Sequence, residues 1–135
     1  MSVDKINKVK EKLKIFLETV PEVIFAYLHG SLAEGLPFRD IDVAIYVNEG
    51  IVSQEKALDY GIRLSIEAEI ATKLSPLDIK VINYAPNGFK YHATKGILLF
   101  SKDDELRCDF LEKLWNKYLD LQPTRKALLL DILTL

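Results

Sequence analysis

A glycine–serine pair and two aspartates form the most informative cluster of residues in the sequence. Gly30-Ser31 comes at the end of an apolar run, and after eight intervening residues Asp40 and Asp42 form a D-x-D pattern. Residues two apart on a strand point to the same face, so these carboxylates can share a divalent cation. Small residues after a strand also let backbone N–H groups and the Ser31 hydroxyl approach phosphate oxygens. Together they indicate a metal-dependent site for a nucleoside triphosphate.

Two common phosphate-binding motifs do not fit this segment. Gly30 and Gly35 have the glycine spacing of a P-loop, but Leu36 and Pro37 stand where that motif requires Lys and Ser or Thr. The chain also contains no G-x-G-x-x-G pattern. A D-x-D pattern alone is weak evidence, because aspartates are common on protein surfaces. The interpretation therefore depends on the Gly-Ser pair and the D-x-D pattern together.

Asp78 is a candidate third carboxylate. It lies in a predicted strand over residues 77–82, where Leu77, Ile79 and Val81 face one way and Asp78, Lys80 and Ile82 the other. Asp78 therefore has the same outward phase as the acids of the D-x-D pattern, which favours a metal or base role. The alternative is a solvent-facing acid paired with Lys80 or Lys73.

The surrounding elements alternate between helical and strand patterns. Apolar residues predict helices over residues 4–20, over 53–74 with a cap at Ser53, up to Lys95, and from Asp103; Leu58, Ile62, Ile66, Ile70 and Leu74 form the stripe of the second helix. Short runs predict strands over residues 23–28, 40–47, 77–82 and 97–100, and residues 30–38 form a loop with one helical turn at most. This alternation predicts an α/β domain around one sheet.

Composition excludes several classes of protein. The 135 residues are 49% hydrophobic and carry a net charge of −2, so the charge balance favours neither nucleic acid nor membrane as a partner. No apolar run reaches the length of a membrane span, and Cys108 is the single cysteine, so a disulfide scaffold and structural zinc are excluded. We expect a cytoplasmic protein.

The pattern of Gly30-Ser31, Asp40-x-Asp42 and Asp78 resembles the nucleotidyltransferases of the DNA polymerase β superfamily. It is most similar to the minimal nucleotidyltransferase (MNT) group, small antitoxins to HEPN-domain toxins, over residues 24–121. The resemblance implies a single-domain polymerase-β-like fold, with a mixed sheet packed against helices. Its parts would be an N-terminal helix 4–20, a catalytic sheet with helices over 23–100, and C-terminal helices over 103–135.

The same resemblance implies roles for individual residues. Asp40, Asp42 and Asp78 would be catalytic and would bind Mg²⁺ or Mn²⁺, and Asp78 could instead activate the attacking hydroxyl. The nucleotide-binding residues would be Gly30, Ser31 and Arg39. The implied reaction transfers AMP from ATP to a hydroxyl of a HEPN-type toxin.

Two features depart from the family pattern. The loop before the D-x-D pattern has eight residues where the family usually has ten, and it contains Ala33-Glu34-Gly35 in place of Ala-Arg-Gly. Near a bound triphosphate Glu34 would repel by roughly 1 kcal/mol, unless it points away or Arg39 restores the local charge. The hypotheses are therefore an enzyme, a binding module that neutralises its partner by covering it, and a small-molecule transferase, which this short chain disfavours.

The apolar segment over residues 127–135 bears on partners. Its leucines would pack on the sheet of their own chain, pair with a second copy in a homo-oligomer, or contact another protein. From the resemblance we expect a HEPN-domain toxin as partner, with no direct binding to nucleic acid or membrane.

Overall fold

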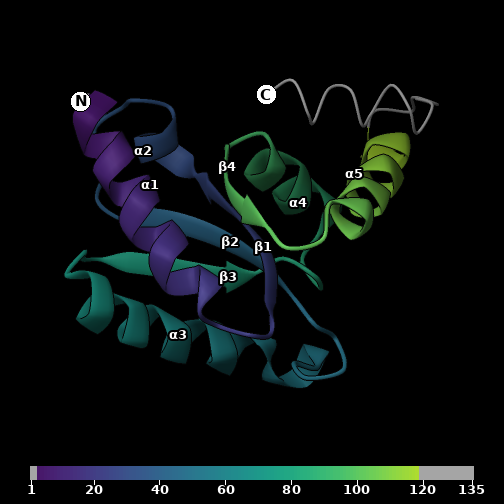
Figure 1. Ribbon diagram of the computed structural model, residues 1–135. Coiled ribbons are helices and arrows are strands. Elements are labelled where there is room, and N and C mark those ends of the chain that lie inside the picture. Colours follow the sequence, from purple (N-terminus) through teal and green to yellow (C-terminus); the bar gives the residue numbers. More distant parts are fainter. Residues whose placement is uncertain (1–2, 119–135) are drawn as a thin grey trace.

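A mixed four-stranded sheet is the centre of the computed structural model, which describes residues 3–118 (Figure 1). The strand order is β3-β2-β1-β4; β1 runs antiparallel to β2 and β4, and β3 runs parallel to β2. The strands are β1 (Val23–His29), β2 (Ile41–Val47), β3 (Leu77–Val81) and β4 (Ile97–Ser101). All four predicted strands are confirmed, and so is the predicted fold class.

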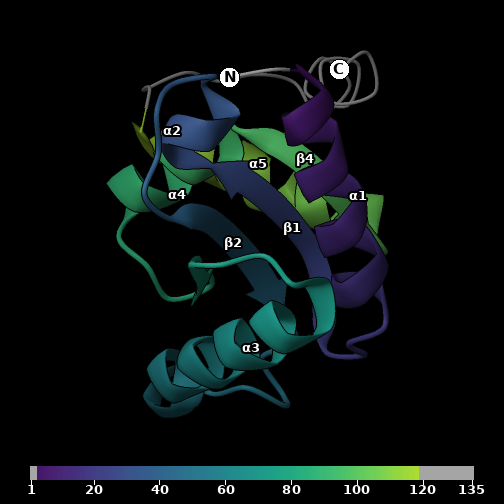
Figure 2. The same ribbon diagram turned by 90° about the vertical axis from the view of Figure 1, so that its left-hand side faces the viewer.

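Helices cover both faces of this sheet. They are α1 (Val3–Glu18), α2 (Gly30–Ala33), the 3-10 turn η1 (Gln54–Lys56), α3 (Ala57–Thr72), α4 (Asn87–Thr94) and α5 (Asp104–Tyr118). The buried side chains of α1 and α3 pack on one face, while α4 and α5 pack on the other. In both views α3 lies at the bottom of the molecule, away from α4 and α5 (Figure 1, Figure 2).

Strand β2 follows the alternation that its sequence predicts. Val43 and Ile45 are fully buried in the core that α1 and α3 cover. On the other face Ala44 is also buried, and Tyr46 stacks on Phe25 with ring centroids 4.9 Å apart. Asp42 lies on that second face and is half-buried, so the carboxylate stands where the packed layer ends.

Most of the apolar stripe of the helix over residues 53–74 faces solvent and does not pack on the sheet. Leu58, Ile62, Ile66 and Ile70 are exposed, and the helix instead buries Gly61, Leu64, Ala68 and Thr72. A stripe with a spacing of four rotates by about 40° per step around a helix, so it does not stay over one contact face. The face with small residues packs on the sheet because it allows a close approach: a Cβ added at Gly61 would lie only 2.6 Å from the backbone oxygen of Ile79.

Several element ends differ slightly from the prediction. Ser53 precedes η1 but makes no capping hydrogen bond, whereas Asp103 caps α5 by accepting from the Leu106 N–H at 3.0 Å. Asp40 lies just before β2 and not inside it. The predicted apolar segment over 127–135 and the end of the C-terminal helical region lie outside the described residues. No helix within residues 3–118 has the length and apolar character needed to cross a bilayer.

Candidate active site

Three polar side chains lie in one row across the sheet. His29 of β1 pairs in register with Asp42 of β2, and Asp42 pairs in register with Asp78 of β3. Residues directly opposite each other on neighbouring strands point to the same face, so these side chains are neighbours. The sequence predicted that Asp42 and Asp78 would share a face, and the parallel pairing of β2 with β3 places them side by side.

Gly30 shapes the backbone next to this row. It has a φ of +79°, and a Cβ added there would overlap the Oδ2 atom of Asp42. Only glycine combines that φ with so close an approach to a carboxylate. The chain then turns through α2, which is closed by hydrogen bonds from the Gly35 N–H to the Leu32 oxygen at 3.0 Å and from the Leu36 N–H to the Ser31 oxygen at 2.9 Å.

A cavity of about 450 Å³ opens beside Asp42. It is lined by Ser31, Pro37, Phe38, Arg39, Asp40 and Asp42. The structure therefore brings together Ser31, Arg39 and two of the predicted acids, Asp40 and Asp42. Gly30 lies against the Asp42 carboxylate. Glu34 is exposed and is not part of the cavity lining. The expected repulsion between Glu34 and a triphosphate stays a prediction. Because Glu34 is exposed, water would screen this repulsion.

The carboxylates of Asp40, Asp42 and Asp78 repel one another. Burial, and then the charges of Asp78 and Asp40, raise the pKa of Asp42 above its ordinary value of 3.8, while Lys80 opposes this. The Lys80 ammonium lies 3.5 Å from an Asp78 oxygen, so the alternative of an Asp78–Lys80 ion pair is also realised. Burial and Lys80 lower the pKa of His29 below 6.5, so the imidazole is neutral at pH 7.

These residues fit a divalent cation, although the site is not a closed set of ligands. Within residues 3–118 no three His, Cys, Asp or Glu side chains lie close enough to form a ready metal cluster. Asp42 and Asp78 are nevertheless adjacent, and Asp40 is near enough to raise the pKa of Asp42. A cation between carboxylates relieves their repulsion, and Mg²⁺ commonly takes only one or two protein acids with water and phosphate oxygens as the other ligands. The donor set therefore suits a cation that binds together with a nucleotide.

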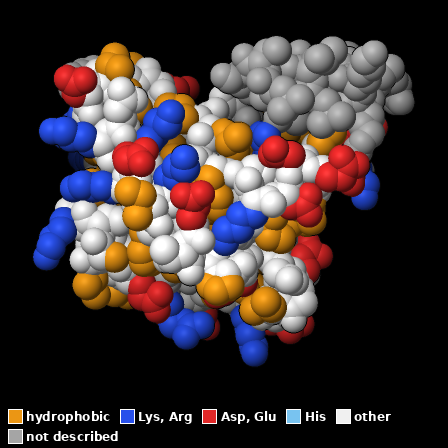
Figure 3. Space-filling view, in the orientation of Figure 1, with side chains coloured by type: hydrophobic (Ala, Val, Ile, Leu, Met, Phe, Trp, Pro, Cys, Tyr) orange, Lys and Arg blue, Asp and Glu red, His pale blue; other side chains and the backbone are white. Residues whose placement is uncertain are grey.

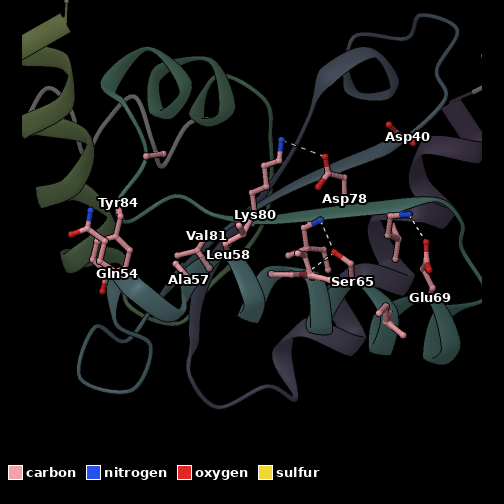
Figure 4. A pocket seen from close by; sticks show the side chains of 16 residues that line it. Asp40, Gln54, Ala57, Leu58, Ser65, Glu69, Asp78, Lys80, Val81 and Tyr84 are labelled. Carbon is pink, nitrogen blue, oxygen red and sulfur yellow. Dashed lines mark hydrogen bonds and ion pairs between the residues drawn. The ribbon is translucent and has the colours of Figure 1, made fainter.

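A second, larger hollow runs along the outer side of β3. It has a volume of about 680 Å³, and its lining includes Asp40 and Asp78 together with residues of α3. Figure 4 shows Asp40, Asp78 and Lys80 on the same side of β3, with α3 on the other. Sequence patterns did not predict this groove, because an apolar stripe on a helix normally faces the core. Asp40 lines both hollows, so the two meet at the carboxylates.

Comparison with known sequences agrees with this geometry. The family described as polymerase beta, nucleotidyltransferase matches residues 11–105, which include Gly30, Ser31 and all three aspartates. The chain belongs to the polymerase β nucleotidyltransferase family. The resemblance to this superfamily is thereby confirmed. No curated protein matches the sequence significantly.

Solved structures of similar fold come from toxin–antitoxin pairs. A mutant of the toxin–antitoxin MntA–HpeT is 24% identical, with 98% of each chain covered and a TM-score of 0.56. A tri-AMPylated Shewanella oneidensis HEPN toxin in complex with MNT antitoxin gives 20% identity, coverage of 96% of this chain and 98% of the other, and a TM-score of 0.60. A toxin–antitoxin with AMP-PNP gives 23% identity, coverage of 94% and 97%, and a TM-score of 0.55. At these identities the likeness establishes that this nucleotidyltransferase shares their fold.

Proposed function

We propose that this nucleotidyltransferase is a Mg²⁺-dependent protein adenylyltransferase that moves AMP from ATP to a hydroxyl of a HEPN-type toxin and so acts as its antitoxin. The observation that carries the proposal is that Asp42 and Asp78 are neighbours on adjacent strands, next to the cavity that Ser31 and Asp42 line. Adjacent carboxylates next to a cavity of about 450 Å³ suit transfer of a phosphoryl-linked group.

In this reaction the acceptor oxygen forms a bond to the α-phosphorus of ATP. The bond from that phosphorus to the bridging oxygen breaks, and pyrophosphate leaves. We assign Ser31 and Arg39 to the phosphates, because both line the cavity. Asp40, Asp42 and Asp78 would hold the Mg²⁺ or Mn²⁺, which supplies positive charge to the phosphate oxygens.

Asp78 is also placed to receive the proton of the acceptor hydroxyl. It lines the outer groove as well as neighbouring Asp42, so an acceptor in that groove can reach it. The Lys80 ammonium lies 3.5 Å from an Asp78 oxygen and can orient this carboxylate. A charged carboxylate can accept a proton, which is what a general base requires.

The solved structures support the choice of substrates. One of them is of a toxin–antitoxin with AMP-PNP, and another is of a tri-AMPylated HEPN toxin in complex with MNT antitoxin. We extend both relations to this chain, and we expect the pair to act in the cytoplasm.

A second candidate function is a binding module with little or no catalysis. One observation favours it: residues 3–118 contain no ready cluster of three metal-ligating side chains. Such a module would neutralise its toxin by forming a complex with it.

One incubation separates the two functions. The chain, the product of the gene next to its own and α-labelled ATP are mixed with Mg²⁺ and resolved on a denaturing gel, and a HEPN-type product is the expected acceptor. Label on the HEPN-type protein that is lost with Asp42→Asn but kept with Glu11→Gln, an exposed acid of α1, supports the transferase. A stable complex without label supports the binding module.

A further inference from the structure

Helix α3 presents an apolar strip to solvent, formed by Leu58, Ile62, Ile66 and Ile70. Their exposed fractions are 74%, 52%, 53% and 72%, and they are spaced at one residue per turn. In the space-filling view, hydrophobic side chains reach the surface in the lower part of the molecule, where α3 lies (Figure 3). Large apolar side chains gathered in one place on a surface usually mark a contact with another molecule.

The strip continues into the groove along β3. Leu58, Ile62 and Ile66 of α3 line the groove, and so do Asp78 and Lys80 of β3. Figure 4 shows Leu58 on the α3 side of the groove, with Asp78 and Lys80 on the other side of β3. The apolar strip and the candidate base therefore belong to one continuous surface. Since Asp40 also lines the nucleotide cavity, a molecule in the groove would meet the nucleotide at the carboxylates.

Backbone N–H groups at the edge of β3 already donate hydrogen bonds to α3 along this groove. The Leu77 N–H donates to Glu69 Oε2 at 2.8 Å, and the Ile79 N–H donates to Ser65 Oγ at 2.9 Å. Both acceptors belong to α3, so these donors cannot pair with an added strand. A partner must therefore bind through side chains packed on the strip, as an amphipathic helix does in an apolar groove.

We propose that the apolar strip and the groove beside it form the docking surface for the acceptor protein. A helical segment of that protein packs apolar side chains against Ile62 and Ile66, and this contact brings its hydroxyl to Asp78. The inference rests on the proposed transfer to a protein hydroxyl. A second copy of this chain is a poorer occupant, because it would cover Asp78 and exclude the acceptor.

The test is the double variant Ile62→Glu with Ile66→Glu, compared with Ile15→Glu as a matched control. Ile15 lies on α1, is 59% exposed and does not line the groove. We expect the double variant to weaken the complex with the HEPN-type protein by about tenfold or more, because charges would be buried in its contact. Its affinity for AMP-PNP with Mg²⁺ and its thermal unfolding should match those of the control.

Binding and transfer are scored separately, so that the two proposals can fail independently. Loss of the complex in the double variant alone supports the docking surface, even if the unmodified pair shows no AMP transfer and the enzymatic proposal fails. An unchanged complex overturns the docking surface, even if transfer proceeds. So does the absence of any complex with the unmodified chain. A wild-type dimer that the double variant converts to a monomer assigns the strip to a second copy and also overturns it.

Discussion

Asp42→Asn should stabilise the metal-free protein at neutral pH. Asp42 lies beside Asp78 in the parallel register, and Asp40 adds to the negative field. For carboxylates about 5 Å apart, as on neighbouring strands, an effective dielectric constant of about 60 for half-exposed groups gives a repulsion of about 1 kcal/mol. The amide keeps the shape of the side chain and removes the charge. We therefore expect a gain of about 1 kcal/mol in unfolding free energy, or a rise in Tm of about 3 °C.

The pH dependence of that gain identifies its cause. Because the pKa of Asp42 is raised in the folded protein, the folded state retains this proton to higher pH than the unfolded chain does. The contribution of Asp42 to stability is therefore largest below its unfolded pKa and is lost as pH rises through its folded pKa. The advantage of Asp42→Asn should be present at pH 7 and disappear near pH 3.

Calorimetric unfolding across this pH range, with and without Mg²⁺ and AMP-PNP, measures both effects. The wild-type Tm should rise when Mg²⁺ and the nucleotide are added together, and Asp42→Asn should lose most of that rise. Glu11→Gln, which removes an exposed charge from α1, controls for net charge. A lower Tm for Asp42→Asn at pH 7, or an advantage that is equal at pH 3 and pH 7, would refute the electrostatic reasoning.

Three further predictions concern the scaffold of the site. Gly30→Ala should lower the free energy of unfolding by about 2 kcal/mol or more in chemical denaturation, because strain at positive φ adds to the overlap with Asp42. Gly35→Ala is its control: Gly35 has a φ of +76° and open space where the Cβ would lie, so this variant should show only the cost of the backbone strain. Glu34→Arg should tighten AMP-PNP binding by about threefold at low salt, with the gain screened away at high ionic strength; equal affinity at every salt concentration would contradict it. Asn83→Ala should cost about 2 to 3 kcal/mol in the same denaturation assay, because the buried amide bonds both the N–H and the oxygen of Val47 at 2.9 and 2.8 Å.

Local patterns were sufficient to predict the strands and the face on which Asp42 and Asp78 lie, whereas Asp40 lies just before β2 and not inside it. The period of two in β2 gave the side on which Asp42 lies, and the same phase in β3 predicted that Asp78 would face the same way. Which strands are neighbours is not encoded in such patterns. The parallel pairing of β2 with β3 places Asp42 and Asp78 side by side, and only the folded structure shows this pairing.

Helix α3 shows why the remaining features could not be predicted. A hydrophobic stripe is normally taken as the packed face, but here Gly61 and Ala68 allow the closest approach to the sheet and leave the larger residues outside. Arg107 is a similar case on α5. It is 3% exposed and donates to the hydroxyl of Tyr27 at 3.1 Å, a partner 80 positions away in sequence. Such pairings depend on tertiary contacts that periodicity does not report.

The most direct test of the central claim is the intact mass of the proposed HEPN-type partner after incubation with this chain, ATP and Mg²⁺. Adenylate transfer through Asp40, Asp42 and Asp78 predicts that the partner gains one or more AMP increments. It also predicts no gain when a chelator is added or when Asp42→Asn replaces the wild type. An unchanged mass in a stable complex, or AMP increments that persist with Asp42→Asn, would contradict it.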